Sequence, residues 1–259
     1  MSGSKLKNKL NAGKLCLGAW MTLGHQAIAE IFANAGFDWI VVDLEHSTIS
    51  IEQAGDLIRT IDLSGVCPLV RLTSNDANQI KRVMDAGAHG IVIPNINTVE
   101  EARLAVASTR YAPRGCRGVG LGRAQKYGPG FKDYLSWQEE DGPIVIVMIE
   151  DISALSFLEG ILSTDGVDGF IIGPYDLSCS MGIPGDFDRP EFIRVVQQIL
   201  EMGLKVGCPS GIHIVEPDPE KLSEAIKKGY KFIAYGVDIR MLDTSARMGV
   251  SASFKEFGK

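Results

Sequence analysis

The chain contains 259 residues, of which 45% are hydrophobic and 22% are charged, values that are ordinary for a globular protein. Its formal net charge of −6 argues against a nucleic-acid-binding protein and against attachment to an anionic membrane, because both require clustered lysine and arginine. No apolar stretch is long enough to span a membrane, and the first residues lack the apolar core of a signal peptide, so we expect a cytoplasmic protein.

The N-terminal segment places Leu6 and Leu10 among lysines, which predicts a short amphipathic helix that packs on the body of the protein. Apolar runs rich in β-branched residues then recur along the chain and predict buried strands. These runs cover residues 15–20, 39–44, 68–72, 90–94, 144–150, 169–173, 205–209 and 232–236.

Segments with helical periodicity separate most of these runs, at residues 27–35, 51–61, 76–86, 99–109, 191–202 and 221–228. Several of the predicted helices end at a glycine, the residue that most often terminates a helix in the left-handed conformation. These glycines are Gly36, Gly87, Gly203 and Gly229. One long irregular stretch, residues 111–143, is predicted to contain a short helix near residues 131–137, and a loop of this length in a compact domain is more often functional than idle.

Alternating strands and helices indicate a parallel sheet with right-handed crossovers. Eight such units in about 250 residues predict an α/β fold, a single (β/α)₈ TIM-type barrel over residues 1–259, preceded by the N-terminal helix. An open, doubly wound sheet is less consistent with the chain, because no G-x-G-x-x-G turn follows the first predicted strand.

Two carboxylates follow neighbouring predicted strands, at the end of the barrel where such folds carry their chemistry. Glu150 ends the run Ile-Val-Met-Ile-Glu, and Asp176 follows Gly-Phe-Ile-Ile-Gly-Pro-Tyr. Each acid alone fits a helix cap or a loop residue. Together they suit a hard divalent cation such as Mg²⁺ or Mn²⁺, with Co²⁺ as a further option.

His46 and Arg71 also stand at carboxyl ends of predicted strands. His46 fits a helix cap, a metal ligand or a general base, and we take it as the candidate base. Arg71 fits either a salt bridge to Asp43 or Glu45 or a fixed cation beside a developing oxyanion, and both roles can hold together.

Other residue types narrow the chemistry. His25, His89 and His213 are interpreted as structural residues. No predicted strand ends in lysine, and Lys205 is placed at the start of the seventh strand, so Schiff-base chemistry is not expected. Five scattered cysteines without a C-x-x-C pair favour buried, reduced thiols over disulfides or zinc ligands.

Several blocks in this order resemble the HpcH/HpaI aldolase family. They are GFDWIVVDLEH from Gly36, PLVR from Pro68, IKRVMDAGA from Ile80, RYAPRGCRGVG from Arg110 and GVDGFIIGPYDLS from Gly166, and they cover nearly the whole chain. The resemblance implies a barrel of the pyruvate-type superfamily, assembled as a hexamer, a trimer of dimers in which the C-terminal helix is exchanged between subunits.

By position, the resemblance implies metal ligation by Glu150 and Asp176, with His46 as base and Arg71 as the residue that stabilises the transition state. It also implies that Asp85 is the carboxylate that supports the base. Simple barrel geometry places Asp85, near the end of a helix, at the opposite face, and spacing alone favours Asp43, so both stay candidates.

For substrate binding, the resemblance implies Trp20, Arg123, Tyr175 and Asp176 at the mouth. The family usually has glutamine two residues before its metal-binding glutamate, where this chain has Met148. Tyr175 also stands where a small residue is common. Both departures predict a narrower and less polar pocket.

The resulting expectation is a metal-dependent aldolase, an aldehyde-lyase that cleaves a 4-hydroxy-2-oxo acid, such as a sugar-acid or dicarboxylic derivative, to pyruvate and an aldehyde. One alternative is a lyase of the citrate-lyase type that acts on a CoA thioester. Others are a phosphosugar isomerase, with a phosphate cradle at Ser210–Gly211 and Gly236–Val237, and a barrel that binds a metabolite without catalysis.

Overall fold

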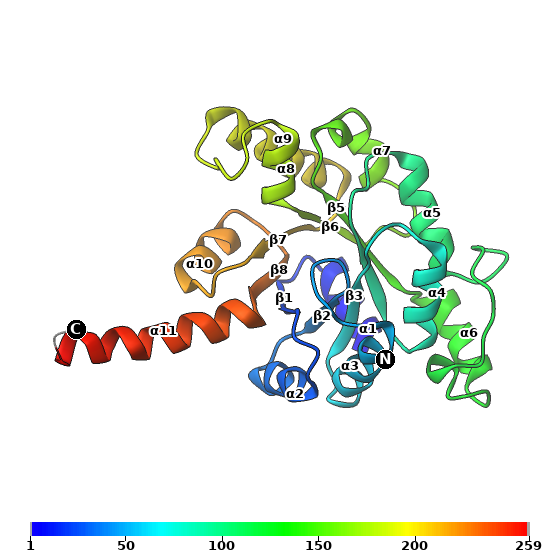
Figure 1. The fold of residues 1–259 in the computed structure, drawn as a ribbon. Helices are drawn as coiled ribbons and strands as arrows, with labels where there is room; N and C mark the ends of the chain where they lie inside the picture. The colour runs from blue at the N-terminus through cyan, green and yellow to red at the C-terminus, as the bar shows by residue number, and fades with distance from the viewer. Residues whose placement is uncertain (1, 258–259) are drawn as a thin grey trace.

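The computed structural model describes residues 2–257, and its centre is a closed barrel of parallel strands (Figure 1). The strands are β1 (Cys16–Met21), β2 (Trp39–Asp43), β3 (Cys67–Arg71), β4 (Gly90–Ile93), β5 (Ile144–Ile149), β6 (Gly169–Ile172), β7 (Ser210–Ile214) and β8 (Phe232–Val237). They pair in chain order, and β8 pairs with β1 to close the ring. The predicted TIM-type barrel is confirmed.

Helices precede the barrel, connect its strands and follow it. They are α1 (Ser2–Asn11), α2 (Gln26–Ala35), α3 (Ile51–Leu63), α4 (Ala77–Asp85), α5 (Val99–Thr109), α6 (Phe131–Glu140), α7 (Leu158–Leu162), α8 (Pro174–Ser180), α9 (Pro190–Val206), α10 (Pro219–Lys227) and α11 (Asp238–Phe257), with 3₁₀ turns η1 (Arg123–Gln125) and η2 (Ile152–Phe157). The short helix predicted in the long loop is α6. Within residues 2–257, no helix combines the length and the apolar character needed to cross a membrane.

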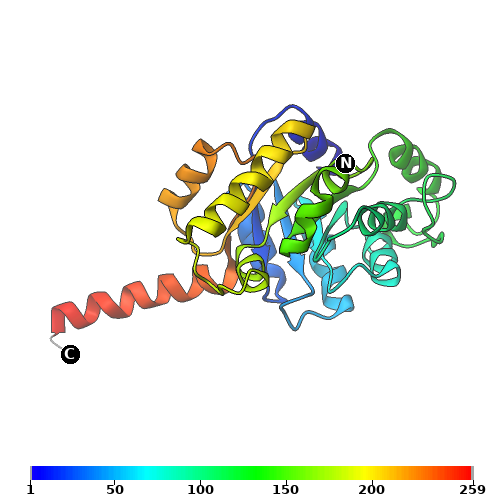
Figure 2. The ribbon, with the colours of Figure 1, turned by 90° about the horizontal axis from the view of Figure 1, so that it is seen from above.

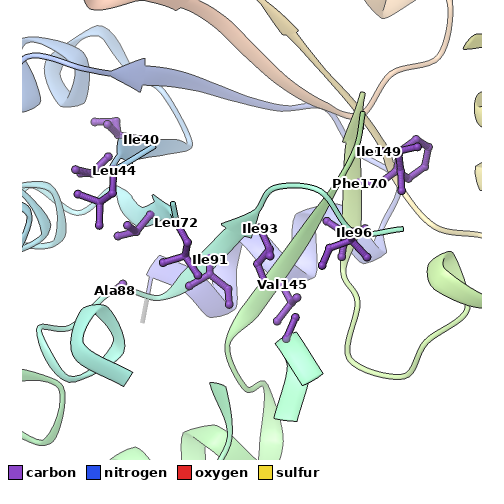
Figure 3. Packing of buried hydrophobic residues seen from close by; sticks show 14 of the residues in the cluster. Ile40, Leu44, Leu72, Ala88, Ile91, Ile93, Ile96, Val145, Ile149 and Phe170 are labelled. Carbon is purple, nitrogen blue, oxygen red and sulfur yellow. The ribbon is translucent and has the colours of Figure 1, made fainter. Parts of the chain in front are cut away.

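Strand side chains alternate between two cores, because successive residues of a strand point to opposite faces of the sheet. Outward-facing residues such as Ile40, Ile91 and Val145 pack beneath the surrounding helices (Figure 3). Inward-facing residues such as Trp39 and Leu69 fill the barrel itself. The same alternation decides which side chains near the strand ends face the barrel axis.

The N-terminal helix packs against the barrel as its leucine spacing predicts. Leu6 and Leu10, only 3% and 1% exposed, join the inner core with Trp39 and Phe232 at the amino-terminal ends of the strands. Lys7 adds an ion pair to Asp168, with 3.0 Å between Nζ and Oδ1. Helix α1 therefore seals this end of the barrel.

The last helix does not cover its own barrel. Helix α11 begins directly after β8 and projects away from the rest of the chain (Figures 1 and 2). Its exposed residues include Leu242, Met248, Val250 and Phe254. A helix that presents apolar side chains to solvent in this way lacks the packing that stabilises an ordinary outer helix.

The seventh strand differs from its prediction. It was expected at residues 205–209, but α9 continues to Val206 and β7 begins at Ser210. Gly203 was taken for the helix terminator, yet it lies inside α9 and packs against the Phe170 ring, where a Cβ atom would approach Cε1 to 2.5 Å. The terminator is Gly207, whose φ is 73°.

This shift relocates several residues. Lys205 lies on α9 and pairs with Glu159 at 3.0 Å rather than beginning a strand. Ser210 and Gly211 begin β7, at the amino-terminal end of the barrel, so they cannot form a phosphate cradle at the carboxyl ends of the strands. His213 lies within β7 instead of in the loop that follows it.

The packing of Gly203 gives a stability prediction. Gly203→Ala should lower the free energy of unfolding by about 1–3 kcal/mol, because the added methyl group meets Phe170. Gly55→Ala is the matched control: Gly55 is also inside a helix, and an added Cβ atom would lie 3.9 Å from its nearest neighbour, Ala86 Cβ. It should gain roughly 0.5–1 kcal/mol from helix propensity. Equal midpoints in urea for the two variants would contradict this account.

Candidate active site

The predicted site residues of β1, β2, β3 and β5 converge at the carboxyl-terminal mouth of the barrel. Asp43 and Arg71 end neighbouring strands and are paired in the sheet register. Glu150 follows β5 in phase with Met148, which belongs to the inner core, and Trp20 belongs to the same core. Alternation therefore turns these side chains toward the barrel axis.

The strongest contact at the mouth is a buried ion pair. Arg71 donates from Nε to Asp43 Oδ1 at 2.9 Å and from Nη2 to Oδ2 at 2.5 Å. Trp20 donates its indole N–H to the same Oδ2 at 3.0 Å. Burial acts to raise the pKa of Asp43, but the hydrogen bonds and charge of Arg71 outweigh burial, so the pKa is lowered and the carboxylate stays ionised.

The loop after β2 carries Glu45 and His46. Asp43 Oδ1 accepts both of their backbone N–H groups, at 2.9 and 3.2 Å, which fixes the start of the loop. Glu45 pairs with Arg71 Nη1 at 3.1 Å, and both predicted salt bridges of Arg71 are thus present. His46 is 64% exposed, with Nε2 3.9 Å from Glu45. It does not cap α3, because Ser50 does.

Glu150 is a buried carboxylate in an electrostatically unfavourable position. Its Oε1 accepts the backbone N–H of Asn95 at 2.7 Å. Burial raises the pKa of Glu150 to about 7, and the nearby carboxylates of Glu45 and Asp176 add to the rise. A group in this state gains from any cation that binds beside it.

The residues after β6 bring a second acid to the same mouth. Asp176 lies in the first turn of α8, next to Tyr175, which is 56% exposed and meets Phe187 edge-on. Gly173 separates this helix from Glu150: a Cβ atom there would come within 2.5 Å of Glu150 Oε2. Glycine is thus needed for the two acids to share the site.

The donor set fits a hard divalent cation. Glu150 and Asp176 offer carboxylate oxygens from adjacent strands, whose final residues Ile149 and Ile172 are paired. After burial, the charge of Asp176 is among the causes that raise the pKa of Glu150, so the two acids lie in the same part of the mouth. Among the described residues, no group of three or more His, Cys, Asp or Glu forms a metal site, so water or substrate oxygens would complete the coordination.

Two residues that the resemblance assigns to the mouth lie elsewhere in this chain. Asp85 ends α4, at the amino-terminal side of the barrel, where Arg117 Nη2 donates to its Oδ1 at 2.6 Å. Arg123 pairs with Asp62, near the end of α3, at 2.6 Å. Neither side chain is brought to His46 of the same chain. Barrel geometry predicted this for Asp85, whereas the position of Arg123 differs from the one that the resemblance implies.

Two further residues reach the mouth that sequence reasoning left out. His213 was interpreted as structural because the seventh strand was placed five residues too early; its ring stacks on Trp20 with centroids 4.5 Å apart. Asn95, in the loop after β4, donates its backbone N–H to Glu150 and has a φ of 53°, a conformation that asparagine tolerates.

A barrel with acids, an arginine and a histidine converging at its mouth is the arrangement of an enzyme active site. A sequence profile described as HpcH/HpaI aldolase/citrate lyase matches residues 17–244, and the chain belongs to this family. The family resemblance inferred from the sequence blocks is thereby confirmed. Enzymes of this class II type generally depend on a divalent metal.

Relatives support the same assignment across the chain. A hydroxypyruvate/pyruvate aldolase of Sagittula stellata is 38% identical over 244 residues, 94% of this chain and 95% of the relative. A 4-hydroxy-2-oxo-heptane-1,7-dioate aldolase of Salmonella dublin is 38% identical over 243 residues, 93% of this chain and 90% of the relative. A solved HpcH/HpaI aldolase from Desulfitobacterium hafniense superposes with a TM-score of 0.89 at 29% identity, covering 96% of each chain. The enzyme is an aldehyde-lyase.

The raised pKa of Glu150 predicts that the stability of the protein depends on pH. Its pKa of about 7 in the folded protein exceeds the ordinary 4.5, so the folded state binds the proton more tightly. The free energy of unfolding should therefore fall as pH rises between these values, by up to about 3 kcal/mol. In metal-free protein, Glu150→Gln should raise the melting temperature by several degrees at pH 8 and have no effect near pH 4.

Thermal denaturation with EDTA measures this difference. Saturating Mn²⁺ should stabilise the wild type but not Glu150→Gln. Glu30→Gln, at an exposed position on α2, is the charge-matched control and should show neither effect. A Glu150→Gln protein that is less stable than wild type at pH 8 would refute the raised pKa of Glu150.

Proposed function

We propose that the enzyme is a metal-dependent aldolase that cleaves 4-hydroxy-2-oxo acids to pyruvate and an aldehyde and catalyses the reverse addition. The observation that carries the proposal is that one mouth contains both Glu150 and Asp176, two carboxylates suited to bind a cation, and Arg71, a buried arginine held in place by Asp43. Relatives named for pyruvate, hydroxypyruvate and a 4-hydroxy-2-oxo dioate support this substrate class.

Glu150 and Asp176 would hold the cation, which we propose to be Mg²⁺ or Mn²⁺, with Co²⁺ as a further option, because their donors are hard oxygens. When bound, the ion supplies Lewis-acid polarisation of the substrate's keto group. Tyr175 and the N-terminal turn of α8 flank the place where the substrate carboxylate would lie.

The remaining steps belong to side chains of the mouth. His46 accepts the proton of the C4 hydroxyl, directly or through a water, and its exposed ring is free to do so. The C3–C4 bond breaks, the aldehyde departs, and the bonding electrons pass into the enolate of pyruvate. Arg71 lies beside this developing negative charge and needs little reorganisation, because Asp43 already fixes its guanidinium.

The central test is pyruvate release from a panel of 4-hydroxy-2-oxo acids, with Mn²⁺ or Mg²⁺ and with EDTA. Release should require the metal. Arg71→Ala and His46→Ala should each lower kcat about 100-fold or more. His46→Ala should keep its melting temperature within a few degrees, whereas Arg71→Ala should also lower it because Asp43 loses its buried partner, so its kcat is measured well below its melting temperature. Arg59→Ala, on the outside of α3, is the control and should keep full activity. Near-wild-type turnover in both mouth variants would refute these roles.

The same panel separates the rivals. CoA-dependent turnover would support the citrate-lyase-like reading, and metal binding without turnover of any oxo acid would support a metabolite-binding barrel. Met148, buried beside the site, and Tyr175 reduce its polarity, so we expect small or apolar aldehydes to be accepted better than charged ones.

We further propose that the protein works in the cytoplasm as a hexamer, a trimer of dimers that exchange α11. The exposed apolar side chains of α11 support an exchanged helix, since a partner barrel would bury them. Asp85 and Arg123 pair with Arg117 and Asp62 in this chain, away from its own mouth, so the mouth roles that the resemblance implies would require sites shared between subunits.

Subunit complementation tests the role of Asp85. His46→Ala and Asp85→Asn proteins should each be nearly inactive alone, but mixed assemblies made by co-expression should regain about a quarter of wild-type activity, the share of sites with both residues intact. The control is co-expression of His46→Ala with Arg71→Ala, two residues of the same mouth, which should regain nothing. Full activity of Asp85→Asn alone, or no rescue in the first mixture, would contradict the shared site.

A further inference from the structure

His213 occupies a position at the mouth that the proposed reaction does not use. Its imidazole lies on β7 and stacks on the indole of Trp20, with centroids 4.5 Å apart and planes 15° apart. The two residues come from strands separated by β8, so the stack spans the barrel interior rather than a strand pair. Trp20 is only 1% exposed, whereas His213 is partly exposed and helps to cover it.

A backbone carbonyl fixes the ring in this place. His213 Nε2 lies 3.3 Å from the carbonyl oxygen of Gly236 on β8. A carbonyl only accepts, so Nε2 carries the proton and donates. Gly236 has a φ of 72°, and the pairing of β8 with β1 shifts register nearby, a local irregularity that only glycine adopts readily.

The stack continues into the catalytic ion pair. The Trp20 indole N–H is bonded to Asp43, Asp43 holds Arg71 through two hydrogen bonds, and the Arg71 guanidinium carbon lies 4.9 Å from the Trp20 ring centre. The indole therefore touches His213, Asp43 and Arg71 at once. Any tilt of the indole changes the geometry of the carboxylate and of the guanidinium.

The surroundings of His213 favour the uncharged form of its imidazole. Burial lowers the pKa of His213 to about 4, against the opposing effect of the Gly236 carbonyl, and the charge of Arg71 lowers it further. The imidazole is thus uncharged at neutral pH and places no second cation beside Arg71. It supplies a flat polarisable face and one hydrogen bond.

We propose that His213 is a positioning residue of the aldolase: its imidazole holds the Trp20 indole, and the indole N–H in turn fixes the Asp43–Arg71 pair for enolate stabilisation. This inference rests on the proposed function, in which Arg71 balances the charge of the enolate. It assigns to His213 no contact with the substrate, only control of the guanidinium through two intervening side chains.

Kinetics of two His213 variants separate a positioning role of the ring from a direct part in the reaction. His213→Ala removes the stacking face and should lower kcat about 10- to 100-fold, with KM for the oxo acid changed less than about threefold, because misplacement of Arg71 acts on the transition state. His213→Phe restores a flat face without a titratable group and should recover kcat to within about threefold of wild type.

Coupling to Trp20 gives the decisive control. Trp20→Phe removes the indole N–H, so the link from His213 to Asp43 is already broken. In this background His213→Ala should lower kcat less than about twofold further. A merely structural role would lower the melting temperature of both histidine variants without this dependence on Trp20.

Tryptophan fluorescence tests the stacking of His213 on Trp20 without any substrate. His213→Ala should move the tryptophan emission to longer wavelength and increase acrylamide quenching, because Trp20 loses its cover, and His213→Phe should reverse both changes. In the Trp20→Phe background, the emission of Trp39 and Trp137 should not respond to His213→Ala.

The outcomes are distinguishable. If the wild type releases no pyruvate under any metal condition, the proposed function is wrong, while the fluorescence still decides whether His213 holds Trp20. Unchanged kcat in His213→Ala, additive losses with Trp20→Phe, or a His213→Phe protein as slow as His213→Ala would each overturn the positioning role.

Discussion

The mouth of the barrel is organised around one buried contact, the paired hydrogen bonds between Arg71 and Asp43. Removing either partner would leave a charge in a site with little water, which is far more costly than losing an exposed ion pair. The contact also joins two adjacent strands at their last residues and fixes the loop that carries His46 through backbone N–H groups. One ion pair therefore orients the candidate electrostatic catalyst and anchors the candidate base.

Whereas Arg71 and Asp43 neutralise each other, the acids on the other side of the mouth lie in positions that disfavour their charge. Glu150 is buried near two other acids, and only the N–H of Asn95 offers it a direct hydrogen bond among the described residues. The packing of the barrel core and of the surrounding helices offsets the free-energy cost of this arrangement. Functional sites often contain such unfavourable electrostatics, and a bound cation would relieve it.

Much of this organisation follows from the sequence. The eight-unit barrel, the inward acids and the arginine were predictable because period-two alternation and strand ends are local features. The seventh strand was misplaced because Gly203 looks like a helix terminator, whereas its true constraint is contact with Phe170, which is 33 residues away in sequence. Because that strand was misplaced, His213 was not recognised as a residue of the mouth. The stack on Trp20 and the repulsion at Glu150 depend on distances across the barrel, which no local pattern encodes.

Helix α1 has a consequence for the order of events. Leu6 and Leu10 cover the base of the inner core, and inward-facing side chains such as Trp39 fill the barrel above them, so small molecules reach the site only from the carboxyl-terminal mouth. The two products of a cleavage must therefore leave by the same side from which the substrate entered. A product that still occupies the mouth blocks the next substrate, so product release would contribute to the rate of turnover.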